Sequence, residues 1–426
     1  MPARFLASLL AACAVGAAAY GPAADAETLQ VWSYLRADTA SKDVKERAVG
    51  EIVQAFKAAS PGMDVAVTVM PWQQLSPSLL RASKSGQVPD VVMLFSPSVQ
   101  MQIAAGTLSP LQPHIDKWPQ DVRADLVHLS QNMAPKGGTY AVPWQLRVSG
   151  LMYRDDILKA AGKEPPRTLD ELAALAKSLP KDGNVGLAMG FSPEAPSVAA
   201  GWFLTTVVGS GAKVFNDDGS AAFDSPQAER VAKWARDLVH SGNDAWPLNV
   251  ALQGQEQAYS LFNAKRSVFF AMSSDRLDNV RLKTQLGNDI KMVRYPGWDK
   301  DKPSPALVQA WNFVIPKGAR NEAAAWKFIE VSASSDLQTK LAKLAGFVPV
   351  RRSSLKDPWF QSPEAQNIDW AVDYAASHPL EFQFPENTET LYDVWAKMFG
   401  QILTDKMPPR EALKAAEAEY NRRTGH

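Results

Sequence analysis

The chain has 426 residues, of which 46% are hydrophobic and 21% charged, proportions typical of a soluble globular protein. Because a single hydrophobic core rarely serves more than about 250–300 residues, this length predicts two lobes. The 45 basic residues balance 45 acidic ones along the chain, which disfavours nucleic acid or an anionic membrane surface as a partner.

Residues 1–26 have the pattern of a secretory signal peptide. A charged start at Arg4 precedes an apolar stretch from Phe5 to Ala19 and an A-x-A cleavage site at Ala24–Ala26. The apolar stretch is too short for a membrane-spanning helix of roughly 20 residues. We expect cleavage after Ala26, with acylation of Cys13 at a lipoprotein box as the alternative. Either form would be periplasmic or otherwise extracytoplasmic.

Strands and helices alternate over the first part of the mature chain. Short β-prone runs predict strands at 28–32, 64–70 and 91–95. Helical spacing of apolar residues predicts helices at 41–56 and 79–85. This order implies a parallel sheet with helices on its faces.

The alternation resumes after Gly137-Gly138. A capping box at Thr168–Glu171 predicts a helix that continues to Leu179, and Ser225-Pro226 begins another that ends near Gly242. Further predicted elements are strands at 149–153, 185–189, 267–272 and 306–315 and helices at 321–331 and 410–423. We therefore expect two α/β units side by side.

Motifs for catalysis, metals and cofactors are absent or incomplete. The five histidines are scattered without an H-E-x-x-H pattern, and the single cysteine lies in the signal peptide. Gly209-Ser210-Gly211 begins like a dinucleotide motif, but Val214 stands where its third glycine belongs, so a turn is favoured. We expect no cofactor and no metal. A secreted glycoside-active enzyme remains the enzymatic alternative, because paired carboxylates have no sequence motif.

Four of the 13 tryptophans fall at predicted strand ends or beside proline and glycine: Trp72, Trp144, Trp202 and Trp311. Open α/β sheets bind ligands at the carboxyl ends of their strands. An aromatic face suits the apolar C–H face of a pyranose, while the sugar hydroxyls need polar partners. The polar candidates are Ser96, Ser98, Gln145, Ser273, Ser274 and Asn312. Each of these residues alone is equally well explained by a turn or a structural hydrogen bond.

The order of these elements resembles the extracellular solute-binding family that includes maltodextrin-binding and glycerol-phosphate-binding receptors. The segments that carry the resemblance are Leu29–Trp32, Pro61–Val65, Pro89–Leu94, Gly106–Leu111, Gly138–Pro143, Leu151–Asp155, Thr168–Leu172 and Gly346–Arg351. They span nearly the whole mature chain, and their order is more specific than any one of them.

The resemblance implies a type II periplasmic-binding-protein fold, an α/β architecture of two lobes joined by a hinge. The chain would cross the hinge near Tyr140–Gln145, Ala310–Phe313 and Val350–Ser354. The implied lobes are residues 27–143 plus 312–350 and residues 144–311 plus 351–426.

The resemblance also implies a set of ligand contacts: Ser33, Tyr34, Trp72, Phe95, Ser96, Arg147, Trp202, Ser273, Ser274, Trp311 and Tyr392. Where maltodextrin receptors place a stacking tryptophan after the 267–272 strand, this chain has Asp275-Arg276. Arg147 and Arg276 together could hold a phosphate or carboxylate. We expect a neutral sugar instead, since other family members bind neutral sugars with an arginine in the cleft. A glycerol phosphate or a uronate is the alternative.

The expected function is therefore that of the substrate-binding component of an ABC importer. Such a monomeric carrier would close on a carbohydrate, deliver it to the transmembrane subunits of a permease and catalyse nothing. Two rivals remain, a secreted glycoside-active enzyme and a ligand-sensing partner of a membrane kinase.

Overall fold

The computed structural model describes residues 27–127, 132, 137–180, 182–192, 197–242, 244–380, 382 and 384–426. The predicted signal peptide and Cys13 lie outside these residues. In the described ranges no helix combines the length and apolar character needed to cross a membrane.

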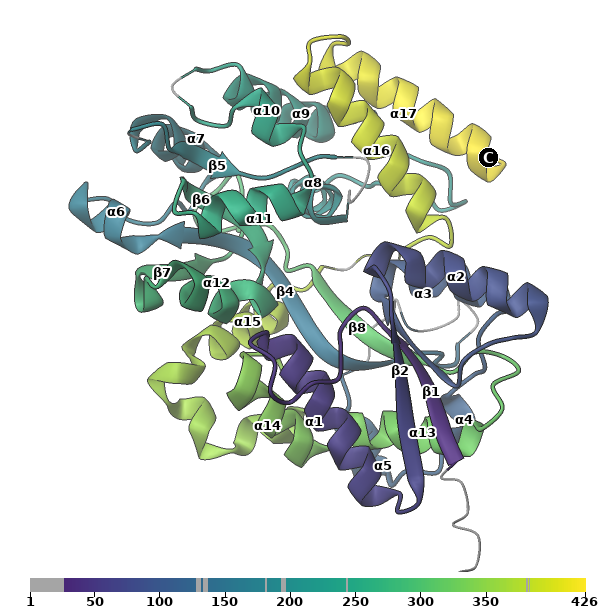
Figure 1. Ribbon diagram of the computed structural model, residues 1–426. Helices are drawn as coiled ribbons and strands as arrows, with labels where there is room; N and C mark the ends of the chain where they lie inside the picture. Colours follow the sequence, from purple (N-terminus) through teal and green to yellow (C-terminus); the bar gives the residue numbers. More distant parts are fainter. Residues whose placement is uncertain are drawn as a thin grey trace, which may run out of the picture.

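The described strands form one sheet path in the order β2-β1-β3-β8-β4-β6-β5, with β7 paired to β4 (Figure 1). Their bounds are β1 (Glu27–Ser33), β2 (Met63–Val69), β3 (Val91–Phe95), β4 (Val142–Arg154), β5 (Val185–Ala188), β6 (Ser267–Ser273), β7 (Ile290–Val293) and β8 (Val308–Val314). The parallel pairing predicted for the first three strands is confirmed.

Helices flank this sheet on its faces. Those of the first half of the chain are α1 (Val44–Ala59), α2 (Trp72–Ser85), α3 (Ser96–Ala104), α4 (Gln112–Ile115), α5 (Gln120–Asp125), α6 (Asp155–Ala160), α7 (Leu169–Ser178) and α8 (Ser197–Gly209). Those that follow are α9 (Pro226–Val239), α10 (Leu248–Ala251), α11 (Gln255–Asn263), α12 (Leu277–Thr284), α13 (Glu322–Ser332), α14 (Ser335–Ala345), α15 (Gln366–Ser377), α16 (Thr388–Leu403) and α17 (Pro409–Thr424). A short 3-10 helix, η2 (Ser274–Arg276), follows β6.

Two strands, β4 with 13 residues and β8 with seven, connect the two halves of the molecule (Figure 1). Residues 142–148 of β4 pair antiparallel with β8, and residues 149–154 pair antiparallel with β6 and β7. The sequence predicted only 149–153 as a strand here. The prediction missed residues 142–148 because β4 is buried along nearly its whole length and so shows no alternation of polar and apolar residues.

Each half has its own apolar interior. Phe56, Phe313 and Phe328 belong to a first cluster, whereas Phe203 and Phe399 belong to a second. The stretch from Phe360 to Tyr374 also packs into the first cluster, although the predicted lobe division assigns it to the second half. The division by residue numbers therefore stays a prediction, and core packing favours moving this stretch.

The capping box predicted at α7 is confirmed. Thr168 Oγ1 accepts a hydrogen bond from the amide of Glu171 at 3.1 Å, and Glu171 Oε2 accepts one from the amide of Thr168 at 3.3 Å. Both groups satisfy amides that have no partner within the helix.

We expect Thr168→Ala to lower the free energy of unfolding by about 1 kcal/mol, because the first turn of α7 loses this cap. The shift of the urea-denaturation midpoint measures the effect. Lys177→Ala, at the exposed end of the same helix, is the matched control and should leave the midpoint nearly unchanged. Equal shifts for both variants would contradict a role for the cap.

Candidate functional site

A cavity lies where β4 and β8 join the two halves. The residues that line it are Tyr34, Lys45, Trp72, Phe95, Arg147, Gln255, Glu256, Met272, Asp275, Arg276 and Trp311. They come from α1, α2, β3, β8 and the residue after β1 on one side, from α11, β6 and η2 on the other, and from β4, which carries Arg147. The volume open to the centre of a water molecule is about 60 Å³, which holds a few waters.

One wall of the cavity is aromatic. The ring of Trp311 lies 4.1 Å from Tyr34, 5.2 Å from Phe95 and 6.4 Å from Trp72, measured between centroids. Phe95 and Trp311 are directly opposite each other in the antiparallel pairing of β3 with β8, so their side chains share one face. This wall therefore presents several ring faces and edges that can contact an apolar surface of a bound molecule.

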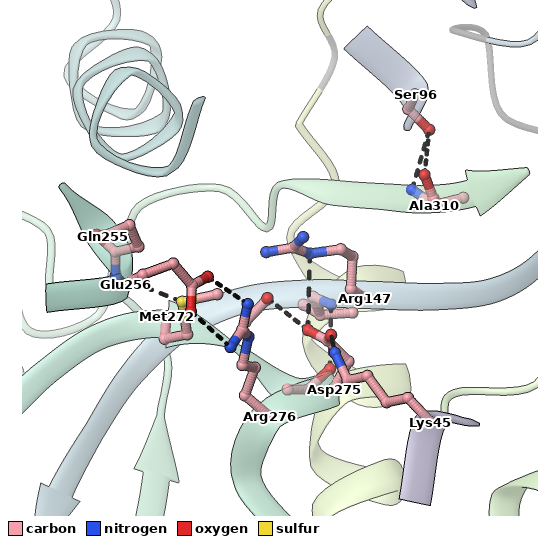
Figure 2. A network of polar contacts seen from close by, with 12 residues as sticks. Lys45, Ser96, Arg147, Gln255, Glu256, Met272, Asp275, Arg276 and Ala310 are labelled. Carbon is pink, nitrogen blue, oxygen red and sulfur yellow. Dashed lines mark hydrogen bonds and ion pairs between the residues drawn. The ribbon is translucent and has the colours of Figure 1, made fainter. Parts of the chain in front are cut away.

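Charged residues from both sides line the rest of the cavity (Figure 2). Lys45 Nζ lies 2.5 Å from Asp275 Oδ2, and Arg147 Nε lies 3.6 Å from Asp275 Oδ1. Arg276 pairs with Glu256 at 2.5 Å. Burial alone would raise the pKa of the Asp275 carboxyl, but the charges of Lys45, Arg147 and Arg276 outweigh it and hold that pKa well below its usual range.

Several polar atoms at and near the cavity have no hydrogen-bond partner among the described residues. Tyr34 Oη, Gln255 Oε1 and Arg147 Nε belong to the lining, and both side-chain ends of Gln145 and the hydroxyl of Tyr392 are also buried without a partner. Burial raises the pKa of the Tyr392 hydroxyl, and the nearby charge of Arg147 opposes that rise. Buried polar groups are normally hydrogen-bonded, so the unpaired atoms of the lining are candidates for pairing with a ligand.

The cavity brings together only part of the site predicted from the sequence. Of the predicted ligand residues, those that line it are Tyr34, Trp72, Phe95, Arg147, Arg276 and Trp311. The sequence interpretation missed Lys45, Gln255, Glu256 and Met272, and it treated Asp275 only as a departure from the family pattern. The sequence did not indicate Lys45 as a cavity residue. The helix α1 was predicted from its apolar stripe, and that pattern does not show which charged residue of the first turn faces a cavity.

Trp144 and Trp202, predicted to line the cleft, pack into the hydrophobic interiors instead. Trp144 stacks on Phe313 with centroids 5.9 Å apart, next to a bulge in β4. Trp202 lies within α8 rather than in a connection and contacts Trp234 at 5.5 Å. Both side chains are at most 2% exposed, so neither offers a ring face to a ligand in this structure.

The Ser96 hydroxyl and the Asn312 amide form hydrogen bonds within the protein. Ser96 Oγ accepts from the amide of Ala310 at 2.9 Å, and it also donates to the carbonyl of the same residue. Asn312 Nδ2 donates to Leu94 O and to Ser96 Oγ. These bonds tie β3 and α3 to β8, and neither residue lines the cavity, so their pairing with ligand hydroxyls stays a prediction.

The predicted serine contacts likewise have internal partners. Ser33 Oγ accepts from the backbone amide of Leu35, and Ser274 Oγ accepts from the amide of Val148. Ser273 Oγ donates to Asp275 Oδ1 at 2.6 Å. Ser273 and Ser274 therefore position η2 and its carboxylate, and none of the three serines lines the cavity.

Ser98, a further polar candidate, lies outside the cavity and donates weakly to Glu389 at 3.5 Å, which links α3 to α16. In the part of the chain that the structure describes, no group of three or more histidine, cysteine, aspartate or glutamate residues could hold a metal ion.

Comparisons with known proteins bear on the family and the fold of this chain. The family model for bacterial extracellular solute-binding proteins matches residues 51–367. A binding protein of Brucella abortus is 22% identical over 379 residues, which cover 87% of this chain and 88% of that protein.

Solved structures match over almost the whole fold. An ABC transporter solute-binding protein of Thermotoga lettingae, bound with α-D-tagatose, has a TM-score of 0.79 at 21% identity and covers 93% of this chain and 99% of its own. Maltose-bound MalE3 of T. maritima has a TM-score of 0.80 at 21% identity with the same coverage. The predicted two-lobed α/β fold is confirmed.

Proposed function

Because this chain belongs to the bacterial extracellular solute-binding proteins, we propose that it is the substrate-binding component of an ABC importer and captures a carbohydrate between its two halves. It would act as a monomer in the periplasm or another extracytoplasmic space. It would deliver the sugar to the transmembrane subunits of a permease, and ATP hydrolysis would belong to a different subunit.

The observation that carries this proposal is the pairing of two unlike walls in one cavity. Tyr34, Trp72 and Trp311 on one side offer ring faces to the apolar C–H face of a sugar. Arg147 on β4 and Gln255 on α11 offer buried polar atoms that lack partners among the described residues, which suits sugar hydroxyls. A purely apolar solute would leave those atoms unpaired.

Capture and release would require the two halves to move about β4 and β8. The space of about 60 Å³ admits only a few waters, so a sugar enters only when the two walls separate. Separation would break the contact between Lys45 on α1 and Asp275 on η2. A solute drives closure to the extent that it binds the closed form better than the open form.

The known members and relatives of this family are binding proteins rather than enzymes, and the carboxylates of the cavity support the same role here. A glycosidase needs one carboxyl with a raised pKa to donate a proton. Asp275 has its pKa held low, and Glu256 is engaged by Arg276. We propose that the chain catalyses no reaction.

Thermal denaturation of the full chain with a panel of neutral and acidic saccharides and sugar alcohols tests the proposal. At least one saccharide should raise the melting temperature, since a ligand at 100 times its Kd adds about 2.7 kcal/mol to the stability. Failure of every saccharide in the panel would contradict the proposed function. Oligosaccharides shortened on incubation with the protein would instead favour the enzymatic alternative.

A further inference from the structure

The charges that line the cavity do not cancel. Lys45, Arg147 and Arg276 are positive, whereas Glu256 and Asp275 are negative, so three cations face two anions and one positive charge is in excess. Removing an unpaired charge from water is costly, and buried charges are therefore normally paired. The excess points to a negative charge that the ligand supplies.

Two of the three cations already have close partners. Arg276 forms two hydrogen bonds to the carboxylate of Glu256, at 3.2 and 2.5 Å, and lies over the ring of Tyr259 at 4.5 Å. Lys45 donates to Asp275 at 2.5 Å. The charge of each of these two cations is therefore balanced by a carboxylate of the protein.

Arg147 is the one of these three cations whose ion pair includes no hydrogen bond. Its Nε lies 3.6 Å from Asp275 Oδ1, too far for a hydrogen bond, and Asp275 already accepts from Lys45 and Ser273. The guanidinium carbon lies 5.0 Å from the ring of Phe95, and the side chain is only 9% exposed. Figure 2 marks the ion pair between Arg147 and Asp275 with a dashed line, and the terminal nitrogens of the guanidinium lie on the side away from Lys45.

We propose that the solute is a sugar acid whose single carboxylate is bound by the guanidinium group of Arg147. This inference rests on the proposed carbohydrate-binding function and narrows its substrate class. Two parallel N–H donors of an arginine match the two oxygens of a carboxylate, and the resulting charge-assisted bonds are about twice as strong as neutral ones. The carboxylate would neutralise the excess charge, and the ring would lie against Trp72 and Trp311.

A carboxylate fits the charge count better than a phosphate ester. A phosphate monoester carries about −1.5 to −2 charges at pH 7, which would exceed the single positive charge available. The earlier possibility that Arg147 and Arg276 hold an anion together is not favoured, because Glu256 occupies Arg276.

Calorimetric titrations with matched acid and neutral sugars test the inference on the full chain. The probes are glucuronate against glucose, galacturonate against galactose, and glycerol 3-phosphate, all at one fixed ionic strength. The wild type should bind one of the acids about 10- to 100-fold more tightly than its neutral counterpart. Arg147→Met should remove that preference. Arg147→Lys keeps the charge but not the two parallel N–H donors, and it should retain part of the preference.

Circular dichroism checks that the variants fold, and Arg410→Met, an exposed arginine on α17, should bind like the wild type. Equal binding of acid and neutral sugars, an acid preference that survives in Arg147→Met, or preference for glycerol 3-phosphate would overturn the inference. Tight binding of a neutral sugar would overturn the inference but would leave the proposed function intact. Binding of no saccharide at all would contradict both.

Discussion

Replacing Asp275 with asparagine should lower the free energy of unfolding by about 3–5 kcal/mol, the usual cost of removing one partner of a buried ion pair. The side chain of Asp275 is only 1% exposed, and it lies between Lys45 and Arg147. An amide would leave both cations close together without a counter-charge. Chemical denaturation at neutral pH measures the loss.

The same variant should change the pH dependence of stability. The pKa of the Asp275 carboxyl in the folded protein is held below its unfolded value of about 4. Its contribution is therefore complete above about pH 4 and is lost as the pH falls toward the depressed pKa. The stability difference between the wild type and Asp275→Asn should shrink steadily below pH 4.

Two variants serve as controls for this prediction. Asp217→Asn removes an exposed ion pair with Lys213 and should change stability much less. Lys45→Met should cost less than Asp275→Asn, because Asp275 keeps Arg147 and Ser273 as neighbours. If Asp275→Asn were no more destabilising than Asp217→Asn, the carboxylate would not organise this wall.

Replacing Trp72 with alanine should weaken binding of the sugar about 30-fold, which corresponds to about 2 kcal/mol for an aromatic residue at the centre of a contact. Trp72 is half-buried, and its ring meets Phe95 and Trp311 edge-on at 6.3 and 6.4 Å. Removal of the indole takes away apolar area that the closed form presses against the sugar. Calorimetric titration of the tightest saccharide measures the change.

Trp326→Ala is the matched control for Trp72→Ala. Trp326 is also half-buried, but it stacks on His114 at 4.9 Å and lies on α13, outside the cavity. It should lower thermal stability and leave the affinity unchanged. Equal losses of affinity in the two variants would show that the effect comes from general destabilisation and not from the aromatic wall.

The sequence by itself predicted the local structure well where short-range signals decide it. The strand at 91–95 has the predicted bounds, because a run of five apolar residues between polar ones is too short for a helix and suits a buried strand. The capping box at Thr168 follows from side chains three residues apart. The order of such elements also identified the family.

Only the tertiary structure decided which tryptophans reach the cavity. Trp72, Trp144, Trp202 and Trp311 look alike in sequence, but the face on which each side chain lies depends on what packs against it. A bulge in β4 turns Trp144 against Phe313, and the pairing of β8 with β3 turns Trp311 toward Phe95.

The charged wall likewise depended on long-range contacts. Lys45 and Asp275 are separated by 230 residues, so no local pattern indicates that they form an ion pair. The roles of Arg147 and Arg276 differ because Glu256 on α11 reaches Arg276 alone. Electrostatic pairing is set by distance in space, which the sequence fixes only through the complete fold.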